Sequence, residues 1–483
     1  MKISYTSSCG FTRILLFSFL FFASISHAQV GIGNTNPNAS SMLDITSTEK
    51  GFLAPRMTTA QRNAITTPAN SLLVYDTDLK SFYYYDLSSV SWVKVNSGSN
   101  QRNNYKLVKS VSDLAPELAL GGGNRYLLQT NTYYEINGTI LLAFPIDLNN
   151  AYLSGLDANE DILFRATGAV FQGTSGGSIR NVTLTGGGSA FNITGGTSLL
   201  VQNTVVANFG GGVGTISNVG LYFGNIVQFV GNTGGITYNN IPTLLLSNQA
   251  WFADNTGTYE KFTGTFGLVQ KISGFSTVNS PAIGFDVSAN PVVGTGVMLS
   301  TVFTGTGNYI NGYMPEPYIG HDFTNQWTVD CPGILEESDR VASAHMYFAL
   351  ENALVTNITS NNIPVKMAGT TTASGLYRMS TDGINNRIKY KGERQRHFTV
   401  TSSATIERTD NGSRNVYSLI IYKNGAIIPS IVSEQTFENG ISKANFTVVG
   451  SLTLDTDDYI EVFVSTDNSN IDPTVTRFNL VIE

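Results

Sequence analysis

The sequence predicts an all-β protein: a right-handed parallel β-solenoid, followed by a C-terminal jelly-roll sandwich and preceded by a small N-terminal hairpin module. Three observations predict this fold class. Residues 161–274 hold short apolar clusters separated by Gly, Asn and Thr, with almost no charge. Residues 364–483 alternate polar and apolar positions over longer runs. Only 13% of residues are charged and 11% are aromatic, which excludes a disordered or highly charged helical chain.

The middle of the chain carries near-repeats with an aliphatic residue two places before an asparagine. They are IRNVTL from Ile179, VQNTVV from Val201 and ISNVGL from Ile216. Their asparagines, Asn181, Asn203 and Asn218, are expected to stack as an amide ladder. A period of about 15 to 22 residues without helical periodicity suits solenoid coils, which bury one another's apolar faces.

Residues 1–28 have the features of a secretory signal peptide. Lys2 and Arg13 supply positive charge, and residues 14–22 form an apolar core. The mature chain is expected to begin at Gln29 and to be secreted, extracellular or at the cell surface. No later run approaches the roughly 18 apolar residues of a membrane span, so no membrane insertion is expected.

After cleavage, the chain retains one cysteine, Cys331, and a net negative charge. The signal segment holds two of the 28 basic residues and none of the 35 acidic ones. A single thiol excludes an internal disulfide and a cysteine-based metal site. An acidic chain without a Lys/Arg stripe is a poor candidate for binding nucleic acid or anionic membrane.

Residues 29–95 predict an N-terminal attachment module with one helix and a hairpin. Thr59 is expected to cap a helix over residues 60–65, which Pro68 ends. The hairpin consists of two strands and a closing aromatic residue: residues 72–75, residues 81–85 and Trp92.

Three motifs characterise this module: VGIGNTNPNAS, KGFLAPRMT and a hairpin ending in WV. With these motifs, residues 29–95 resemble the N-terminal module of many secreted, fibre-like proteins of the Bacteroidetes. The resemblance implies an extracytoplasmic fibre or adhesin context and no particular reaction.

Residues 96–104 have the polar composition of a flexible linker, and residues 105–330 are predicted to form the solenoid with a cap at its N-terminal end. A cap is expected because the first coil otherwise exposes a sheet edge and an open core. Residues 331–363 are predicted to be a connector. Within it, alternation around Ala344 and Met346 favours a strand over a helix.

Residues 364–483 predict the jelly-roll head. Long alternating strands joined by hairpin turns, including Asn424-Gly425, describe a sandwich. The runs NVYSLIIYKNGAII and LTLDTDDYIEVFV resemble the tumour-necrosis-factor-like jelly-roll heads that end many phage and bacterial fibres. Such heads are commonly trimeric, so the resemblance implies a homotrimer.

Right-handed β-helices include polysaccharide lyases and phage tailspike hydrolases, so catalysis has to be considered. A glycosidase needs two carboxylates about 5 to 10 Å apart in a groove. The acids of the solenoid are Asp147, Asp157, Glu160, Asp161, Asp254, Glu260 and Asp286. Only Glu160 and Asp161 are adjacent, and neighbours on a strand point to opposite faces. We therefore predict no enzyme, no catalytic, cofactor-binding or metal residue and no cofactor, and expect these acids to cap turns.

The histidines of the mature chain, His321, His345 and His397, lie in separate segments without the spacing of a zinc site. His321 and Asp322 precede Cys331 closely enough to suggest a nucleophile with its base. A lone buried thiol is the better interpretation.

Three further stretches have alternative interpretations. The glycines of residues 210–217 lack the Lys-Ser/Thr ending of a phosphate-binding loop, so corner positions are expected. Residues 455–458 and 467–472 are oxygen-rich loops that can bind calcium, but neither is a complete calcium loop and solvated turns are favoured. One exposed face of Tyr83 and Tyr85 can stack on sugar rings.

These predictions favour a secreted or surface-exposed fibre-like adhesin, a homotrimer that binds a glycan or another cell-surface ligand through its C-terminal head. Three weak contacts then combine through avidity. Two alternatives stay open: a tailspike-like polysaccharide lyase or hydrolase, and a structural subunit of an extracellular filament.

Overall fold

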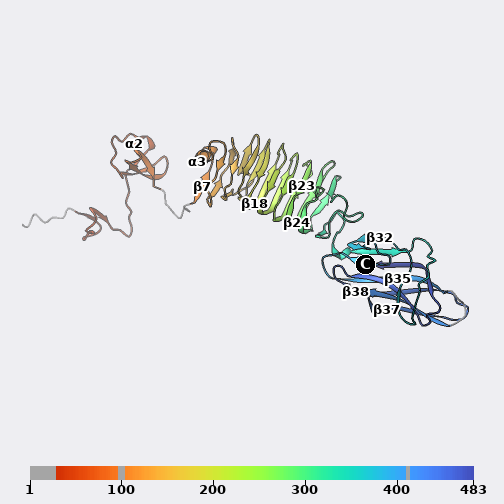
Figure 1. Cartoon of the computed structure of the whole chain (residues 1–483). Helices are drawn as coiled ribbons and strands as arrows, with labels where there is room; N and C mark the ends of the chain where they lie inside the picture. Colours follow the sequence, from red (N-terminus) through yellow and green to blue (C-terminus); the bar gives the residue numbers. More distant parts are fainter. Residues whose placement is uncertain (1–28, 96–103, 409–413) are drawn as a thin grey trace, which may run out of the picture. The chain divides into compact units, whose positions relative to one another are not determined.

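The computed structural model describes three stretches of the chain, residues 29–95, 104–408 and 414–483 (Figure 1). The chain divides into two units, Met1–Gln101 and Arg102–Glu483. The predicted signal peptide, residues 1–28, lies outside the described residues, as does the predicted linker apart from Asn104. Strands dominate both units, which confirms the all-β prediction.

The first unit combines a parallel two-stranded sheet, a four-stranded sheet and a short helix, α2 (Thr59–Asn63). Thr58 caps this helix, because its Oγ1 accepts from the Gln61 N–H at 3.2 Å while Gln61 Oε1 accepts from the Thr58 N–H at 2.9 Å. The prediction of Thr59 as the cap was therefore wrong by one residue: only Thr58 has a glutamine in position to close the reciprocal box. The strands are β1 (Val30–Ile32), β2 (Leu43–Ile45), β3 (Arg56–Met57), β4 (Leu73–Asp76), β5 (Ser81–Asp86) and β6 (Ser91–Lys94).

Strand β5 exposes the face opposite to the one predicted. The Arg62 guanidinium lies over the Tyr83 ring at 4.1 Å, and Tyr85 packs edge-on against a neighbouring aromatic ring of the sheet. Phe82 and Tyr84 are instead 42% and 36% exposed. The prediction of an exposed Tyr83 and Tyr85 face was wrong because the helix lays its arginine over that side.

The first unit has almost no apolar core of its own. Among residues 29–95, the buried apolar side chains are Ala54 and Val74. The exposed large apolar side chains are Val30, Ile32, Met42, Leu43, Ile45, Phe52, Leu53, Leu73, Leu79, Phe82, Tyr84, Leu87, Val90 and Val95. So much exposed apolar surface on a small module indicates that another chain covers part of it.

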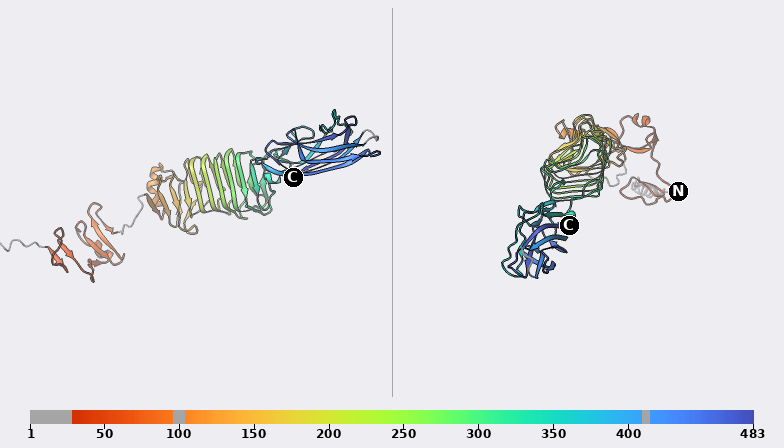
Figure 2. Two further views of the ribbon diagram at one scale, coloured as in Figure 1. Left: turned by 90° about the horizontal axis from the view of Figure 1, so that it is seen from below. Right: turned by 90° about the vertical axis from the view of Figure 1, so that its right-hand side faces the viewer.

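The second unit begins with a parallel β-solenoid, as predicted, and Figure 2 shows its coils stacked side by side. One sheet has 14 strands: β7 (Tyr105–Val108), β9 (Tyr133–Ile136), β10 (Thr139–Leu141), β12 (Tyr152–Ser154), β13 (Ile162–Arg165), β15 (Gly177–Arg180), β16 (Thr183–Gly186), β18 (Gly196–Ala207), β20 (Val219–Val230), β22 (Thr243–Trp251), β24 (Thr265–Thr277), β26 (Val292–Leu299), β27 (Val302–Thr304) and β29 (Trp327–Asp330). The facing sheet has nine: β8 (Tyr126–Leu127), β11 (Ile146–Asp147), β14 (Ala169–Gly173), β17 (Ser189–Ile193), β19 (Gly214–Ser217), β21 (Ile236–Asn239), β23 (Thr258–Thr263), β25 (Ile283–Asp286) and β28 (Asn308–Asn311).

The predicted period of about 15 to 22 residues holds for several coils and is too short for the others. Phe171 pairs with Phe191, 20 residues later, and Ile179 with Val201, 22 residues later. The hydroxyls of Thr277 and Thr304 bond across 27 residues, and Gly296 pairs with Trp327, 31 residues later. The near-repeat ISNVGL caused the error, because its first residues lie in the nine-stranded sheet while IRNVTL and VQNTVV pair in the other sheet.

The predicted asparagine ladder forms for two of its three members. Asn203 Nδ2 donates to Asn181 Oδ1 at 3.1 Å, and both residues have positive φ. Asn218 also has positive φ but lies at a different corner, after β19. In register, the corner of Asn181 and Asn203 continues through other residues with positive φ: Ile226, Asn248, Ser273 and Ser300.

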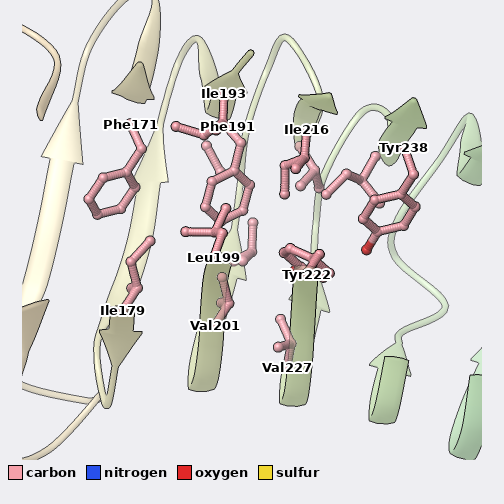
Figure 3. Close-up of a cluster of buried hydrophobic side chains, with 14 of the residues drawn as sticks. Phe171, Ile179, Phe191, Ile193, Leu199, Val201, Ile216, Tyr222, Val227 and Tyr238 are labelled. Carbon is pink, nitrogen blue, oxygen red and sulfur yellow. The ribbon is translucent and has the colours of Figure 1, made fainter. Parts of the chain in front are cut away.

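The interior of the solenoid is filled by stacked apolar side chains (Figure 3). Phe171 and Phe191 stack with their centroids 6.1 Å apart, and the rings of Tyr222 and Tyr238 lie 5.3 Å apart. Burying each such side chain contributes about 1.5 to 3 kcal/mol, and each coil supplies only part of the contact.

Two short helices cover the N-terminal end of the solenoid: η1 (Val111–Leu114) and α3 (Ala115–Leu120). Leu114 belongs to the solenoid core, and Leu118 packs against it. The buried carboxylate of Glu117 accepts a hydrogen bond from the Tyr134 hydroxyl at 2.9 Å, which links α3 to β9.

The second unit ends in two antiparallel sheets that form a sandwich around one apolar core. Strand β30, at Ala344 and Met346, confirms the preference for a strand there and pairs with the last strand of the sandwich. One sheet has five strands: β30 (Ser343–Tyr347), β32 (Thr372–Tyr377), β35 (Arg396–Arg408), β38 (Lys443–Leu454) and β40 (Pro473–Ile482). The other has six: β31 (Val365–Lys366), β33 (Met379–Ser380), β34 (Ile388–Tyr390), β36 (Asn415–Lys423), β37 (Ala426–Phe437) and β39 (Tyr459–Thr466).

Candidate functional site

An open cleft of about 970 Å³ lies where the end of the solenoid meets the sandwich. Its walls come from residues 316–321 after β28, residues 335–343 after β29, and residues 373–383 around β32 and β33. Sequence-distant segments therefore build one concave surface.

The Arg378 side chain joins two of the segments that form these walls, residues 335–343 and residues 373–383. Its side chain is 1% exposed, and its Nε donates to the Tyr377 hydroxyl at 3.1 Å. Its Nη1 donates to Asn325 O at 3.3 Å, and the guanidinium also contacts the Asp339 carboxylate and the Trp327 carbonyl. One planar guanidinium thus joins the sandwich to the last solenoid strand. Its several N–H donors have fixed directions, so one side chain can bond to several acceptors at once.

A second group of polar contacts supports the same junction. Asp339 Oδ2 accepts from the backbone N–H groups of Glu393 at 3.1 Å and Arg394 at 2.9 Å. Asn325 Nδ2 donates to Glu393 Oε1 at 2.8 Å. These bonds connect the end of the solenoid to the sandwich behind the cleft.

Aromatic rings line one wall of the cleft. The His321 imidazole stacks on Tyr377 with centroids 3.9 Å apart, and Tyr318 meets the same ring edge-on at 5.3 Å. Tyr377 is buried, whereas His321 and Tyr318 are partly exposed. Ile319, at the rim, is 95% exposed. Apolar ring faces beside polar edges form a surface that fits amphipathic ring-shaped ligands.

Carboxyl groups with raised pKa values lie beside this wall. Burial raises the pKa of Glu337 to about 7, although its oxygens accept from the N–H groups of Asp322 at 2.8 Å and Phe323 at 2.9 Å. Burial also raises the pKa of Asp322, and the negative charge of Glu316 raises it further. Glu316 lines the cleft. Perturbed acids near a concave surface are typical of functional sites.

The predicted turn-capping role is confirmed for several solenoid acids. Asp161 accepts from the N–H groups of Gly138 at 2.8 Å and Leu156 at 2.7 Å. The other capping acids accept from nearby backbone or hydroxyl donors, and two acids are exposed at the surface. The capping group is Asp147, Asp157 and Asp286, and the exposed pair is Glu160 and Asp254.

Glu260 is the exception, because it lies inside the solenoid. Its Oε1 is 3.0 Å from Lys271 Nζ, and neither side chain is more than 1% exposed. Burial raises the pKa of the Glu260 carboxyl, and Lys271 opposes that shift. The Lys271 ammonium also faces the Tyr259 ring at 4.9 Å. The expectation that Glu260 caps a turn or adds solubility was wrong, because its strand position points inward.

The structure keeps the three histidines apart. His345 stacks on Tyr347, and His397 bonds to the Thr453 hydroxyl, so only His321 lies in the cleft. Over the described ranges, no group of three or more His, Cys, Asp or Glu residues has the geometry to hold a metal.

Cys331 is buried in the solenoid core, as predicted for a lone thiol, and burial raises the pKa of its thiol.

The remaining predicted stretches form turns and corners. Gly211 N–H donates to Gly188 O on the preceding coil at 2.9 Å, so residues 210–212 lie at a corner as expected, whereas residues 214–217 form strand β19. In residues 455–458, Asp458 pairs with Lys423 at 2.7 Å. In residues 467–472, Asp467 accepts from a backbone N–H at 2.8 Å.

Sequence reasoning missed the residues that build the cleft. Tyr318, Tyr377, Arg378 and Glu337 carry no spacing that links them. The one local signal is the loss of the coil pattern where proline becomes frequent, around residues 312–320.

Residues 31–107 match the family model described as "Phage tail like trimerisation region". No curated protein matches the chain. Among solved structures, the chain is similar to the enzymatically active domain of tailspike protein 4 from bacteriophage CBA120, at 9% sequence identity and a TM-score of 0.25. That alignment covers 89% of this chain and 76% of the other.

The tailspike match corrects the prediction that the chain is not an enzyme, because the similar structure is described as an enzymatically active domain. At this identity and TM-score the match assigns no catalytic residue to this chain. The prediction weighed carboxylate pairs only among seven acids of the solenoid, and it considered Asp322 only as a base for Cys331; Glu316 and Glu337 were not considered. None of the described helices has the length and hydropathy to span a membrane.

The trimerisation match and the parallel solenoid together support a tail-fibre-like protein of the receptor-binding type that assembles as a homotrimer.

Proposed function

We propose that the chain is a secreted or surface-exposed, homotrimeric tail-fibre-like protein that binds carbohydrate in the cleft between solenoid and sandwich. The cleft carries the proposal, because its volume, its aromatic wall and its polar rim match what a short oligosaccharide needs. Tyr318 and His321 offer partly exposed ring faces for sugar rings. Lys391 also lines the cleft, and its ammonium, 2.7 Å from Asp457 Oδ1, has further donors for hydroxyl or carboxylate oxygens.

A homotrimer presents three such clefts. Weak binding at each then combines through effective concentration when the ligands are repeated on one surface. The exposed apolar residues of the N-terminal unit supply the contacts that hold the copies together.

The test uses the mature chain on an array of immobilised bacterial surface polysaccharides, followed by titration with soluble oligosaccharides of whichever binds. Tyr318→Ala is expected to weaken binding about tenfold, since an aromatic contact contributes about 1 kcal/mol beyond its buried area. Tyr347→Ala is the matched control, because Tyr347 is a partly exposed ring of the same sandwich outside the cleft. Equal loss in both variants, or no binding to any polysaccharide, contradicts the proposal.

Cleavage of the bound carbohydrate is a second candidate function. It is favoured by two carboxyl groups, Glu316 on the cleft wall and the neighbouring Asp322, whose pKa burial raises, since glycoside hydrolysis uses a pair of carboxyl groups. Incubation with the polysaccharides that bind is expected to release new reducing ends. Asp322→Asn and Glu316→Gln are expected to abolish release while binding remains. Binding without any product from the native chain contradicts this candidate.

A further inference from the structure

The outer face of the 14-stranded sheet carries an apolar column. Leu200, Phe223, Leu245 and Val297 lie in one line of register partners, interrupted only by Gln270. The two lines of register partners beside the column mix polar and apolar side chains on the same outer face. The polar ones are Ser198, Thr243, Thr295, Gln202, Asn225 and Ser247, and the apolar ones are Leu221, Leu268, Ile272 and Leu299. Together with the column, these four apolar residues are called the apolar face.

These side chains point away from the solenoid core. The neighbours of Leu245 along β22, Leu244 and Leu246, are at most 1% exposed, whereas Leu245 itself is partly exposed. Phe223 is likewise partly exposed between two buried positions of β20. Side chains alternate across a strand, so the apolar face is a second apolar surface in addition to the filled interior.

The outer face of the nine-stranded sheet is polar over the same coils. Gln172, Asn192, Thr215, Thr237 and Lys261 form its line of register partners. A sheet with one face on the core and the other in water normally presents polar side chains outside, as this one does. The apolar face departs from that pattern. An apolar surface of this kind on the outside of a protein indicates that another molecule covers it.

The apolar column continues into the region that matches a trimerisation family. Register pairs extend it back through the buried Ser178 and then through Tyr152 and Tyr133 to Tyr105 in β7. The rings of Tyr105 and Tyr133 stack with centroids 6.0 Å apart. Because the matched region spans residues 31–107, its last residues lie on this same outer face.

We propose that the apolar face is the surface through which the solenoids of three copies of this chain pack against one another. The solenoid then contributes trimer contacts along its 14-stranded sheet in addition to those of the N-terminal unit. None of the eight residues of the apolar face carries a charge, so no unpaired charge is buried by the contact. The inference rests on the homotrimer of the proposed function and adds which solenoid face meets its copies.

Cross-linking tests the placement of this surface. Leu245→Cys and Thr237→Cys are made separately in the full mature chain, and each is treated with a short bis-maleimide. Thr237 lies on the polar outer face of the same coil and is the matched control. Covalent products between chains are expected for Leu245→Cys and are expected to be absent for Thr237→Cys and for the unmodified chain, whose Cys331 is buried.

A charge substitution gives a second readout. The variant Phe223→Asp with Leu245→Asp places two like charges on paired rungs of the apolar face, and Thr215→Asp with Thr237→Asp does the same on the polar face. In a dilution series followed by sedimentation, only the first variant is expected to shift from trimer to monomer. Far-ultraviolet circular dichroism checks that both variants are folded.

The outcomes separate the inference from the proposed function. A trimer that cross-links through Thr237→Cys, or through neither cysteine, overturns the inference and leaves the homotrimer intact. A native chain that sediments as a monomer overturns both the inference and the homotrimer. Carbohydrate binding at the cleft is measured independently, so its loss or presence does not decide the packing face.

Discussion

At the scale of single residues, the solenoid corners show a mismatch between side chain and backbone. Ile226 has φ +54° and is 45% exposed, in a column where Asn203 and Asn248 occupy the neighbouring positions. A left-handed backbone costs a side chain of L chirality roughly 1 to 2 kcal/mol, and asparagine tolerates it best after glycine.

We expect Ile226→Asn to raise the free energy of unfolding by about 1 kcal/mol, because it removes the strain of a β-branched residue and extends the amide column. The reciprocal change, Asn203→Ile, is expected to lower stability by at least as much, since it also removes the bond to Asn181. Differential scanning calorimetry of both variants measures the effect. A lower melting temperature for Ile226→Asn contradicts the assignment of strain.

Glu337 predicts a pH dependence. Burial raises the pKa of its carboxyl from the usual 4.5 to about 7, so the folded state binds a proton that the unfolded state releases. The stability contributed by the protonated form is fully present below pH 4.5 and is lost as the pH rises through about 7.

The melting temperature of the native chain is therefore expected to fall between pH 4.5 and pH 7 more steeply than that of Glu337→Gln. The variant is less stable overall, because its amide group accepts from only one of the two N–H groups at residues 322 and 323. Glu336→Gln is the neighbouring control. Parallel slopes for the native chain and Glu337→Gln exclude this role of Glu337.

At the scale of elements, the coil containing β23 and β24 is unusual in enclosing an ion pair. Lys271→Met alone leaves the Glu260 carboxylate buried without its cationic partner, and it is expected to cost about 3 to 5 kcal/mol. The double variant Lys271→Met with Glu260→Leu is expected to recover that loss, since well-packed apolar side chains replace both charges.

The exposed pair of Arg340 and Asp330, 3.4 Å apart, provides the control, and Arg340→Met is expected to change stability by less than about 1 kcal/mol. Urea unfolding of the three variants measures these differences. If the double variant is as unstable as Lys271→Met alone, the ion pair stabilises the solenoid by more than the neutralisation of its two charges.

Elements of regular pattern were predictable from the sequence, and their neighbours in space were not. The alternation around Ala344 and Met346 identified β30, because one face of a strand is buried whatever it pairs with. The asparagine at residue 218 was assigned to the wrong corner because all corners demand the same left-handed backbone. Local pattern thus predicts that a residue is at a corner without predicting which one.

At the scale of the whole second unit, Arg378 decides whether solenoid and sandwich behave as one body. Arg378→Lys retains the charge but only one of the nitrogens that reach Tyr377, Asn325 and Trp327. We expect calorimetry to resolve two unfolding transitions in this variant where the native chain shows one for this unit. Arg387→Lys, at a partly exposed ion pair within the sandwich, is expected to leave a single transition.

The sequence allowed the succession of module, solenoid and sandwich to be predicted, because each has its own hydrophobic period. The cleft was not predictable, since its walls come from residues 316–321, 335–343 and 373–383, which only the folded chain brings together. The same holds for Arg378, whose partners Asn325 and Asp339 precede it by 53 and 39 residues. A junction depends on contacts across the chain that no local period encodes.

The N-terminal unit, with Ala54 and Val74 as its buried apolar side chains, has a consequence for biogenesis. Synthesis delivers this end first, yet its own residues cannot exclude water until sister chains arrive. We expect the interior of the solenoid to fill within a single chain by first-order kinetics, and the N-terminal unit to become ordered at a rate that depends on chain concentration. The N-terminal unit is thus synthesised before the solenoid and is expected to become ordered after it. Dilution during refolding is expected to delay the ordering of the N-terminal unit selectively.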